Sequence, residues 1–295
     1  MDEEAWETAA GRRSLDNGHS RRSTEFDHAR IDSRRGPGRQ RRERNVKAVE
    51  RATYSVGALL FLSGLIHLAI LLIGGGPWEG PVSLRKAATF GLSFGLTLVN
   101  LTFITSFVPL KDRTRTTLLS VFAVACVLET FFVSLQAWRG VPSHFNVETP
   151  FDAAVAQTLA VGGFTLVAII VALTAAAFRA GTVLPPGLRL AIRAGFVALV
   201  GAQIVGGVMI ATGMRLVFGG DPQRAYATGG WLKPVHAVLM HAILVLPLLA
   251  WRIARTDWDE RTQARALRMG IVLYALVVVA TVVVSVLSAG RSDSL

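Results

Sequence analysis

The sequence predicts an all-α polytopic membrane protein: a bundle of seven transmembrane helices with its N-terminus inside and its C-terminus outside. Three observations predict this fold class. The chain of 295 residues is 52% hydrophobic and only 17% charged, which is typical of a chain whose solvent is mostly lipid. Seven stretches are apolar enough and long enough to cross about 30 Å of hydrocarbon as helices. Finally, basic residues are concentrated in alternate connections between these stretches.

The chain begins with a polar segment, residues 1–50, that carries many charges of both signs. Because such a composition buries too little apolar surface to offset the entropy of ordering, we predict a disordered cytoplasmic tail. The half nearest the membrane is basic and predicts attraction to anionic lipids, either as a simple topogenic anchor or as a docking site for a partner. Its basic residues are Arg34, Arg35, Arg39, Arg41, Arg42, Arg44, Lys47 and Arg51.

A seven-helix transmembrane domain is predicted over residues 51–290, followed by a short outer tail at 291–295. The connections are short, which favours antiparallel packing of neighbouring helices. Glycines such as Gly91 and Gly95 permit the close approach of helix backbones. The predicted spans are 53–74, 86–108, 116–138, 152–178, 190–213, 232–254 and 265–288.

The distribution of basic residues predicts the orientation. With the N-terminus inside, the inner segments hold nineteen lysines and arginines and the outer segments hold seven. Positive charge is retained on the cytoplasmic side, so the N-in, C-out arrangement follows. Trp78, Trp138 and Trp231 then lie at the outer interface, where tryptophan is common.

Two classes of protein are disfavoured by composition. The net charge of +11 would indicate nucleic acid if the cations shared one folded surface, but they lie in the tail and between apolar runs. We therefore predict no nucleic-acid partner. The chain has a single cysteine, Cys126, so it forms no intrachain disulfide and offers no cysteine-rich zinc site.

Polar side chains at similar depth in several spans predict an outward-facing cavity that binds or transports a small molecule. His67, Glu129, His236 and His241 lie roughly 6–13 Å below the outer ends of their helices, and an ionisable group inside a span is a candidate functional residue. At the mouth, Arg139 and Arg224 are able to hold a carboxylate or phosphate. The plainer interpretation is that the outer loops only satisfy one another. The candidate ligand-binding residues are His67, Glu129, Gln136, Arg139, His144, Gln157, Arg224, Lys233, His236 and His241.

Two other functions stay open. The first is a membrane redox protein that holds one haem b between His67 and either His236 or His241. The second is a metal-dependent intramembrane enzyme that uses the same histidines with Glu129. A plainer role also exists for the lysines: Lys86 and Lys233 stand near the outer ends of their helices, where a lysine extends to water.

Three stretches resemble an uncharacterised family of bacterial multi-pass integral membrane proteins of the actinobacterial type. They are GGPWEGPVSLRKAATFGLSFG, LQAWRGVPSHFNVETPFD and GGWLKPVHAVLMHAILVLPLLAW. The resemblance covers about residues 53–255. It implies an integral protein of the bacterial inner membrane, and it implies no catalytic residues.

Overall fold

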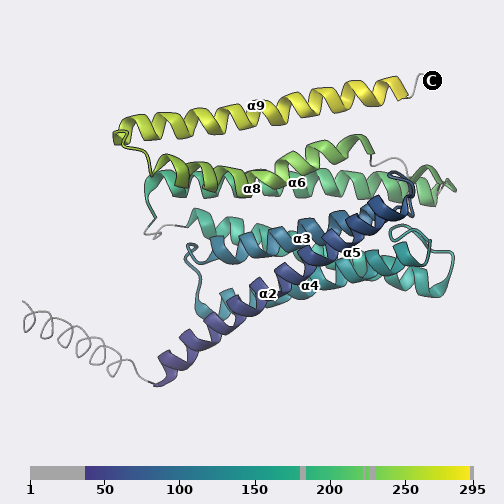
Figure 1. Ribbon diagram of the computed structural model, residues 1–295, viewed down its shortest axis with the longest axis horizontal. Helices are drawn as coiled ribbons and strands as arrows, with labels where there is room; N and C mark the ends of the chain where they lie inside the picture. The colour runs from purple at the N-terminus through teal and green to yellow at the C-terminus, as the bar shows by residue number, and fades with distance from the viewer. Residues whose placement is uncertain (1–36, 180–183, 222, 226–229, 293–295) are drawn as a thin grey trace, which may run out of the picture. The chain divides into compact units, whose positions relative to one another are not determined.

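Helices joined by loops, with no strand, make up the part of the chain that the computed structural model describes, which is residues 37–179, 184–221, 223–225 and 230–292 (Figure 1). Seven of its helices are long and apolar enough to span a membrane, which confirms the all-α, seven-helix prediction. They are α2 (Pro37–Gly74), α3 (Leu84–Thr105), α4 (Asp112–Trp138), α5 (Pro150–Phe178), α6 (Pro186–Phe218), α8 (Lys233–Ile253) and α9 (Glu260–Ser292), and the short 3₁₀ helix η1 (Gly230–Leu232) precedes α8.

The helices overrun several of the predicted spans. Helix α2 begins at Pro37, inside the segment predicted to be disordered, and α6 continues to Phe218. Arginine, glutamate, alanine and glutamine favour helix, so a helix seeded in the membrane extends through them at little cost. Residues 1–36 of the predicted tail and residues 293–295 of the outer tail lie outside the described residues.

Local sequence signals set the helix ends. Ser83 accepts a hydrogen bond from the backbone N–H of Arg85 and starts α3, and Thr149 does the same for Asp152 at the start of α5. Pro150 occupies the first turn of α5, where a missing N–H costs nothing. Gly140 follows α4 with a φ of 68°, a conformation that glycine adopts without strain.

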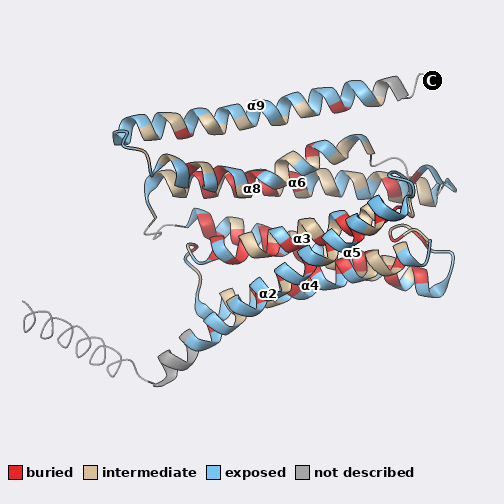
Figure 2. Ribbon diagram, in the orientation of Figure 1, coloured by how far each residue is buried: buried red, intermediate tan, exposed pale blue. Residues whose placement is uncertain are grey.

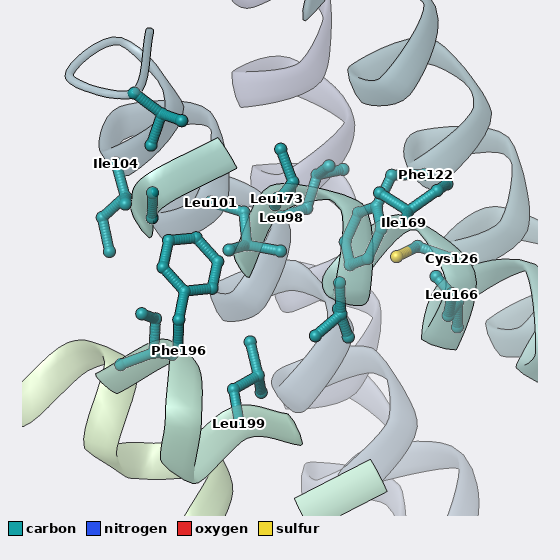
Figure 3. Packing of buried hydrophobic residues seen from close by; sticks show 14 of the residues in the cluster. Leu98, Leu101, Ile104, Phe122, Cys126, Leu166, Ile169, Leu173, Phe196 and Leu199 are labelled. Carbon is teal, nitrogen blue, oxygen red and sulfur yellow. The ribbon is translucent and has the colours of Figure 1, made fainter. Parts of the chain in front are cut away.

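Helices that are neighbours in sequence pack side by side, and α6 lies between α5 and α8. The main hydrophobic core is formed by α3, α4, α5 and α6 (Figure 3). Phe122 from α4 and Phe196 from α6 are among its largest fully buried side chains, and Cys126 packs there as a free thiol. This core packs together the four helices that contact or flank the loop between α4 and α5, which is described below.

Helices α2 and α3 approach so closely that glycine is required at the crossing. A Cβ on Gly91 would lie 2.6 Å from the backbone nitrogen of Gly64, and a Cβ on Gly95 would lie 2.5 Å from that of Phe61. Contacts below 3.0 Å to backbone atoms cannot be relieved by a side-chain rotation. The crossing therefore confirms that these glycines serve backbone packing, as small residues do between membrane helices.

Pro247 inside α8 is compensated by a side chain from α3. Proline has no N–H, so the carbonyl of Ile243, four residues earlier, loses its helical hydrogen bond. The Asn100 side-chain amide of α3 donates to that oxygen at 3.2 Å. An unpaired carbonyl in hydrocarbon is costly, so this bond ties α3 to α8.

Helix α9 is the most exposed of the seven (Figure 2). It packs against α8 and, to a lesser extent, against α6 and η1. Most of its valine and leucine side chains are exposed, including Val279 and Leu287. An apolar surface of this extent suits a helix that faces lipid.

Candidate ligand site at the outer ends of the helices

The loop between α4 and α5, residues 139–149, folds into the bundle at the end where α3, α5 and α8 begin. We call this loop the outer cap, because the basic-residue distribution predicts that this end faces outside. Ser143 and Asn146 of the outer cap are buried, although loops usually lie on the surface. The flanking side chains of Gln136 and Asp152 are buried as well. The site is therefore built of buried polar groups, which need partners.

A hydrogen-bond network around Asp152 joins the two helices that the outer cap connects. Its Oδ1 accepts from Gln136 Nε2 at 2.8 Å and from Arg139 NH1 at 2.6 Å. Its Oδ2 accepts from the hydroxyl of Thr149 at 2.6 Å. Arg139 also donates to the side-chain oxygen of Gln136 and lies over the ring of Phe151. Gln136 and Arg139 thus act together here, as a structural clasp on Asp152.

Aromatic side chains anchor the outer cap to two further helices. Phe145 has a φ of 63°, unusual for a residue with a side chain, and its ring occupies the place where a Cβ on Gly213 of α6 would stand. The ring of His144 lies 5.8 Å from that of Phe90 in α3. The outer cap is therefore held by α3 and α6 as well as by its own helices.

His144 of the outer cap is a neutral imidazole. Burial, together with the positive charge of nearby Lys86, lowers the pKa of His144 to about 3. Its Nδ1 lies 2.9 Å from the Ser143 hydroxyl oxygen. At neutral pH the ring therefore offers hydrogen bonds rather than charge.

Arg85 at the start of α3 and Lys233 at the start of α8 share one acid, Glu79. Arg85 NH2 lies 2.8 Å from Glu79 Oε2, and Lys233 Nζ lies 3.5 Å from the same oxygen. Lys86 lies within electrostatic reach of both Arg85 and Lys233. Lys86 is partly buried, so it does not simply extend to water as its position in the sequence suggested.

Glu129 lies deeper in the bundle than the outer cap, on α4. Its side chain is buried, and Oε1 has no hydrogen-bond partner among the described residues. That oxygen stands 2.5 Å from where a Cβ on Gly162 would be, so α5 has a glycine where the carboxyl group sits. The hydroxyls of Thr130 and Ser134, between Glu129 and the Asp152 network, are likewise buried without a partner in the described part of the chain.

The three predicted intramembrane histidines are not brought together. His67 is buried in α2, where its Nδ1 bonds the Ser63 carbonyl at 2.8 Å and its Nε2 accepts from Trp138 Nε1 at 3.0 Å. His236 bonds the Ala202 carbonyl of α6 at 2.8 Å. His241 is exposed on α8 and bonds only within its own helix, to Ala237, at 2.6 Å. The three imidazole rings thus bond to different partners.

The remaining predicted residues stand at the edge of the site or outside it. Gln157 is exposed on α5, so it faces away from the bundle interior. Arg224 is exposed after α6, and its backbone N–H donates to Asp221 at 3.0 Å. Lys233, at the start of α8, lies 3.5 Å from Glu79 of the loop between α2 and α3.

The histidine arrangement does not fit a haem held between two axial ligands. An indole N–H only donates, so Trp138 fixes Nε2 of His67 as an acceptor and uses the lone pair that iron would require. His241 is exposed and His236 is hydrogen-bonded to α6.

For the metal-enzyme interpretation, the described residues contain no group of three or more histidine, cysteine or acidic side chains placed to hold an ion.

A groove of about 370 Å³ lies elsewhere, between the start of α8 and the outer half of α9. Its lining is apolar apart from a few hydroxyls, and it includes Trp231, Val277 and Val284. None of the predicted ligand-binding residues lines it. It suits a hydrocarbon chain of the surrounding lipid better than a polar molecule.

Three residues of the site did not enter the predicted set. Asp152 and Asn146 occur in a loop whose many hydrogen-bonding side chains are the available signal in the sequence. Lys86 is predicted from its position to extend to water, and nothing local in the sequence shows that His144 of the outer cap would lie near it.

The chain was compared with protein-family models, curated proteins and solved structures, and none of them matches it.

Proposed function

We propose that this integral membrane protein binds a small polar molecule at its outer end, beneath the outer cap. The single observation that supports this proposal is the burial of the outer cap's polar side chains. Of these, Asn146 is fully buried, yet its Nδ2 has no hydrogen-bond partner among the described residues. A buried donor left unpaired costs free energy that a bound ligand would recover.

The geometry around the outer cap supports a preformed site. The Asp152 network fixes one side, and the contacts of Phe145 and His144 with α6 and α3 fix the other. Side chains held in this way lose little entropy when a ligand arrives, which favours binding.

A binding screen tests the proposal. The purified protein in neutral detergent is heated with each member of a panel of anionic, cationic, zwitterionic and neutral metabolites, and the unfolding midpoint is recorded. A ligand raises the midpoint because it binds the folded state. We expect at least one class to do so, and we expect Asn146→Leu and His144→Phe to abolish the rise.

Gln157→Leu is the matched control, because it removes an amide that is exposed on α5. The proposal fails if no class raises the midpoint, or if the rise survives in both outer-cap variants. A rise that is lost in Gln157→Leu as well would point to a general effect on the fold.

Transport of the bound molecule is a second function that one observation favours. Glu129, Thr130 and Ser134 continue the polar groups of α4 inward, and each has a buried oxygen without a partner in the described part of the chain. Proteoliposomes test it: Glu129→Gln should stop uptake of the molecule found in the screen while leaving its binding intact. Uptake at the unaltered rate would remove this function.

We also place the protein in the bacterial inner membrane, with anionic lipids at the N-terminal segment. The resemblance to multi-pass bacterial proteins and the excess of inner basic residues support this location. Arg44, Lys47 and Arg51, the members of the basic cluster with described side chains, are exposed. Flotation of the membrane fraction, with and without those three side chains changed to glutamine, tests the location and the contribution of the charges.

A further inference from the structure

Lys86 is a cation without a counter-ion in the described part of the chain. It is the third residue of α3, and its side chain is partly buried. Its side chain makes no hydrogen bond and no ion pair with any residue that the structure describes, and its backbone N–H is bonded to the Ser83 carbonyl at 3.0 Å. Partial burial weakens the solvation of this charge, and a cation in such a place is a candidate binding residue.

The charges around Lys86 increase its need for an anion. Arg85 and Lys233 are both near enough to repel it. The acid that the structure places beside them, Glu79, is taken by Arg85 at 2.8 Å and Lys233 at 3.5 Å. Glu79 is also largely exposed, so water weakens its charge. Three cations and one shared carboxylate leave a local excess of positive charge.

His144 of the outer cap lies near Lys86 and does not neutralise it. His144 lies close enough to interact with the charge of Lys86, and it carries no negative charge. Phe90, one helical turn after Lys86, holds the His144 ring at 5.8 Å between ring centroids. The start of α3 adds a partial positive charge from its backbone N–H groups.

From this arrangement we infer that Lys86 binds an anion, the carboxylate or phosphate group of a ligand beneath the outer cap. The inference rests on the proposed function and specifies the class of molecule. Two kinds of molecule could bring such an anionic group to the outer end of the bundle: a soluble anion from outside, or an anionic lipid through its headgroup. Lys86 forms the charge-assisted hydrogen bond, and the neutral His144 ring provides a neighbouring polar group.

The test measures the unfolding midpoint of the full-length protein in neutral detergent during titration with inorganic phosphate. Sodium chloride at matched ionic strength corrects for screening. A second arm compares nanodiscs of phosphatidylglycerol with nanodiscs of phosphatidylcholine. We expect phosphate or phosphatidylglycerol to raise the midpoint, and the arm that responds identifies the source.

Variants of Lys86 give the decisive comparison. Lys86→Met keeps the length of the side chain and removes its charge, so the anion-free midpoint should rise and the response to anion should weaken by about 10- to 100-fold. Lys86→Gln guards against misfolding of the methionine variant, and Lys86→Arg should retain the response. Lys111→Met, at the exposed inner end of α4, is the matched control and should respond as the unaltered protein does.

Two results would overturn the inference. One is the absence of any rise with phosphate or phosphatidylglycerol beyond that with chloride. The other is a response that persists unchanged in Lys86→Met and Lys86→Gln. If glycerol or choline raises the midpoint instead, and His144→Phe abolishes that rise, the site under the outer cap stands and its anionic ligand is rejected.

Discussion

At the scale of single residues, the outer end of the bundle is defined by which polar side chains have partners. Asp152 accepts three side-chain hydrogen bonds, whereas Lys86 has none within the described chain. Asp152 therefore belongs to the structure of the outer cap and Lys86 remains available for a ligand. This contrast between two charged residues of the same site separates a structural role from a binding role.

His144 should make the stability of the protein fall in acid. Its pKa is lowered to about 3 in the folded protein, whereas an unfolded histidine titrates near 6.5. The unfolded state therefore binds more protons between these values, and stability is lost as the pH falls from about 6.5 towards 3. The loss approaches about a factor of ten in the folded-to-unfolded ratio per pH unit.

Unfolding midpoints recorded from pH 8 to pH 4 check this. In His144→Phe, which keeps an aromatic ring against Phe90, the decline should be shallower. An identical decline in both proteins would mean that His144 is not the group responsible.

The histidines illustrate what the sequence predicted and what it did not. The position of a residue along a helix predicts its depth in the membrane, and the predicted shared depth of the polar side chains rests on that. Whether a side chain meets another helix or lipid depends on which helix packs against its side of the helix. His236 meets α6 at Ala202, while His241, five residues on and about 140° around the helix, is exposed. A single sequence contains no information on that choice.

At the scale of helices, backbone contact rather than side-chain interlocking sets the crossing of α2 and α3. Gly91→Ala should destabilise the protein by about 1–3 kcal/mol, because the new methyl group meets backbone atoms of Gly64 and Leu60. The matched control is Gly163→Ala in α5, where an added Cβ has nothing within 4 Å. Chemical or thermal unfolding of the two variants measures the difference, and equal stabilities would contradict the tight crossing.

The bond between Asn100 and Ile243 gives a second prediction for helices. Asn100→Leu leaves the Ile243 carbonyl unpaired and should cost about 1–3 kcal/mol. Adding Pro247→Ala restores the N–H that this carbonyl lacks within α8, so the double variant should recover most of the loss. A double-mutant cycle measures the coupling, and strictly additive effects would show that the two residues act independently.

At the scale of the whole molecule, composition and hydropathy were sufficient to predict seven helices, because crossing the bilayer requires about twenty apolar residues each time. Helix ends were predicted less well where polar helix formers, as in the residues after Pro37, extend the helix. The burial of the outer cap was not predictable, since it depends on Phe145 meeting Gly213 from a helix far along the chain.

Seven spans place the two ends of the domain on opposite sides of the membrane, and the excess of inner basic residues predicts the C-terminus outside. Alkaline phosphatase fused to the C-terminus should therefore be active, and green fluorescent protein fused there should be dark. The same reporters placed after Asp257, between α8 and α9, should give the reverse pattern. Bright fluorescence at the C-terminus would invert the predicted orientation.

The amide of Asn100 also has a consequence for biogenesis. It is synthesised 143 residues before its partner Ile243, an interval of roughly 7–30 s at ordinary rates of translation. During that time α3 has left the ribosome while α8 does not yet exist. The amide must then be accommodated by water, by lipid headgroups or by the insertion machinery, since hydrocarbon offers it no partner. A nascent chain that stops before α8 thus keeps the Asn100 amide unpaired at membrane depth. Insertion of α8, the sixth span, provides the Ile243 carbonyl as its partner.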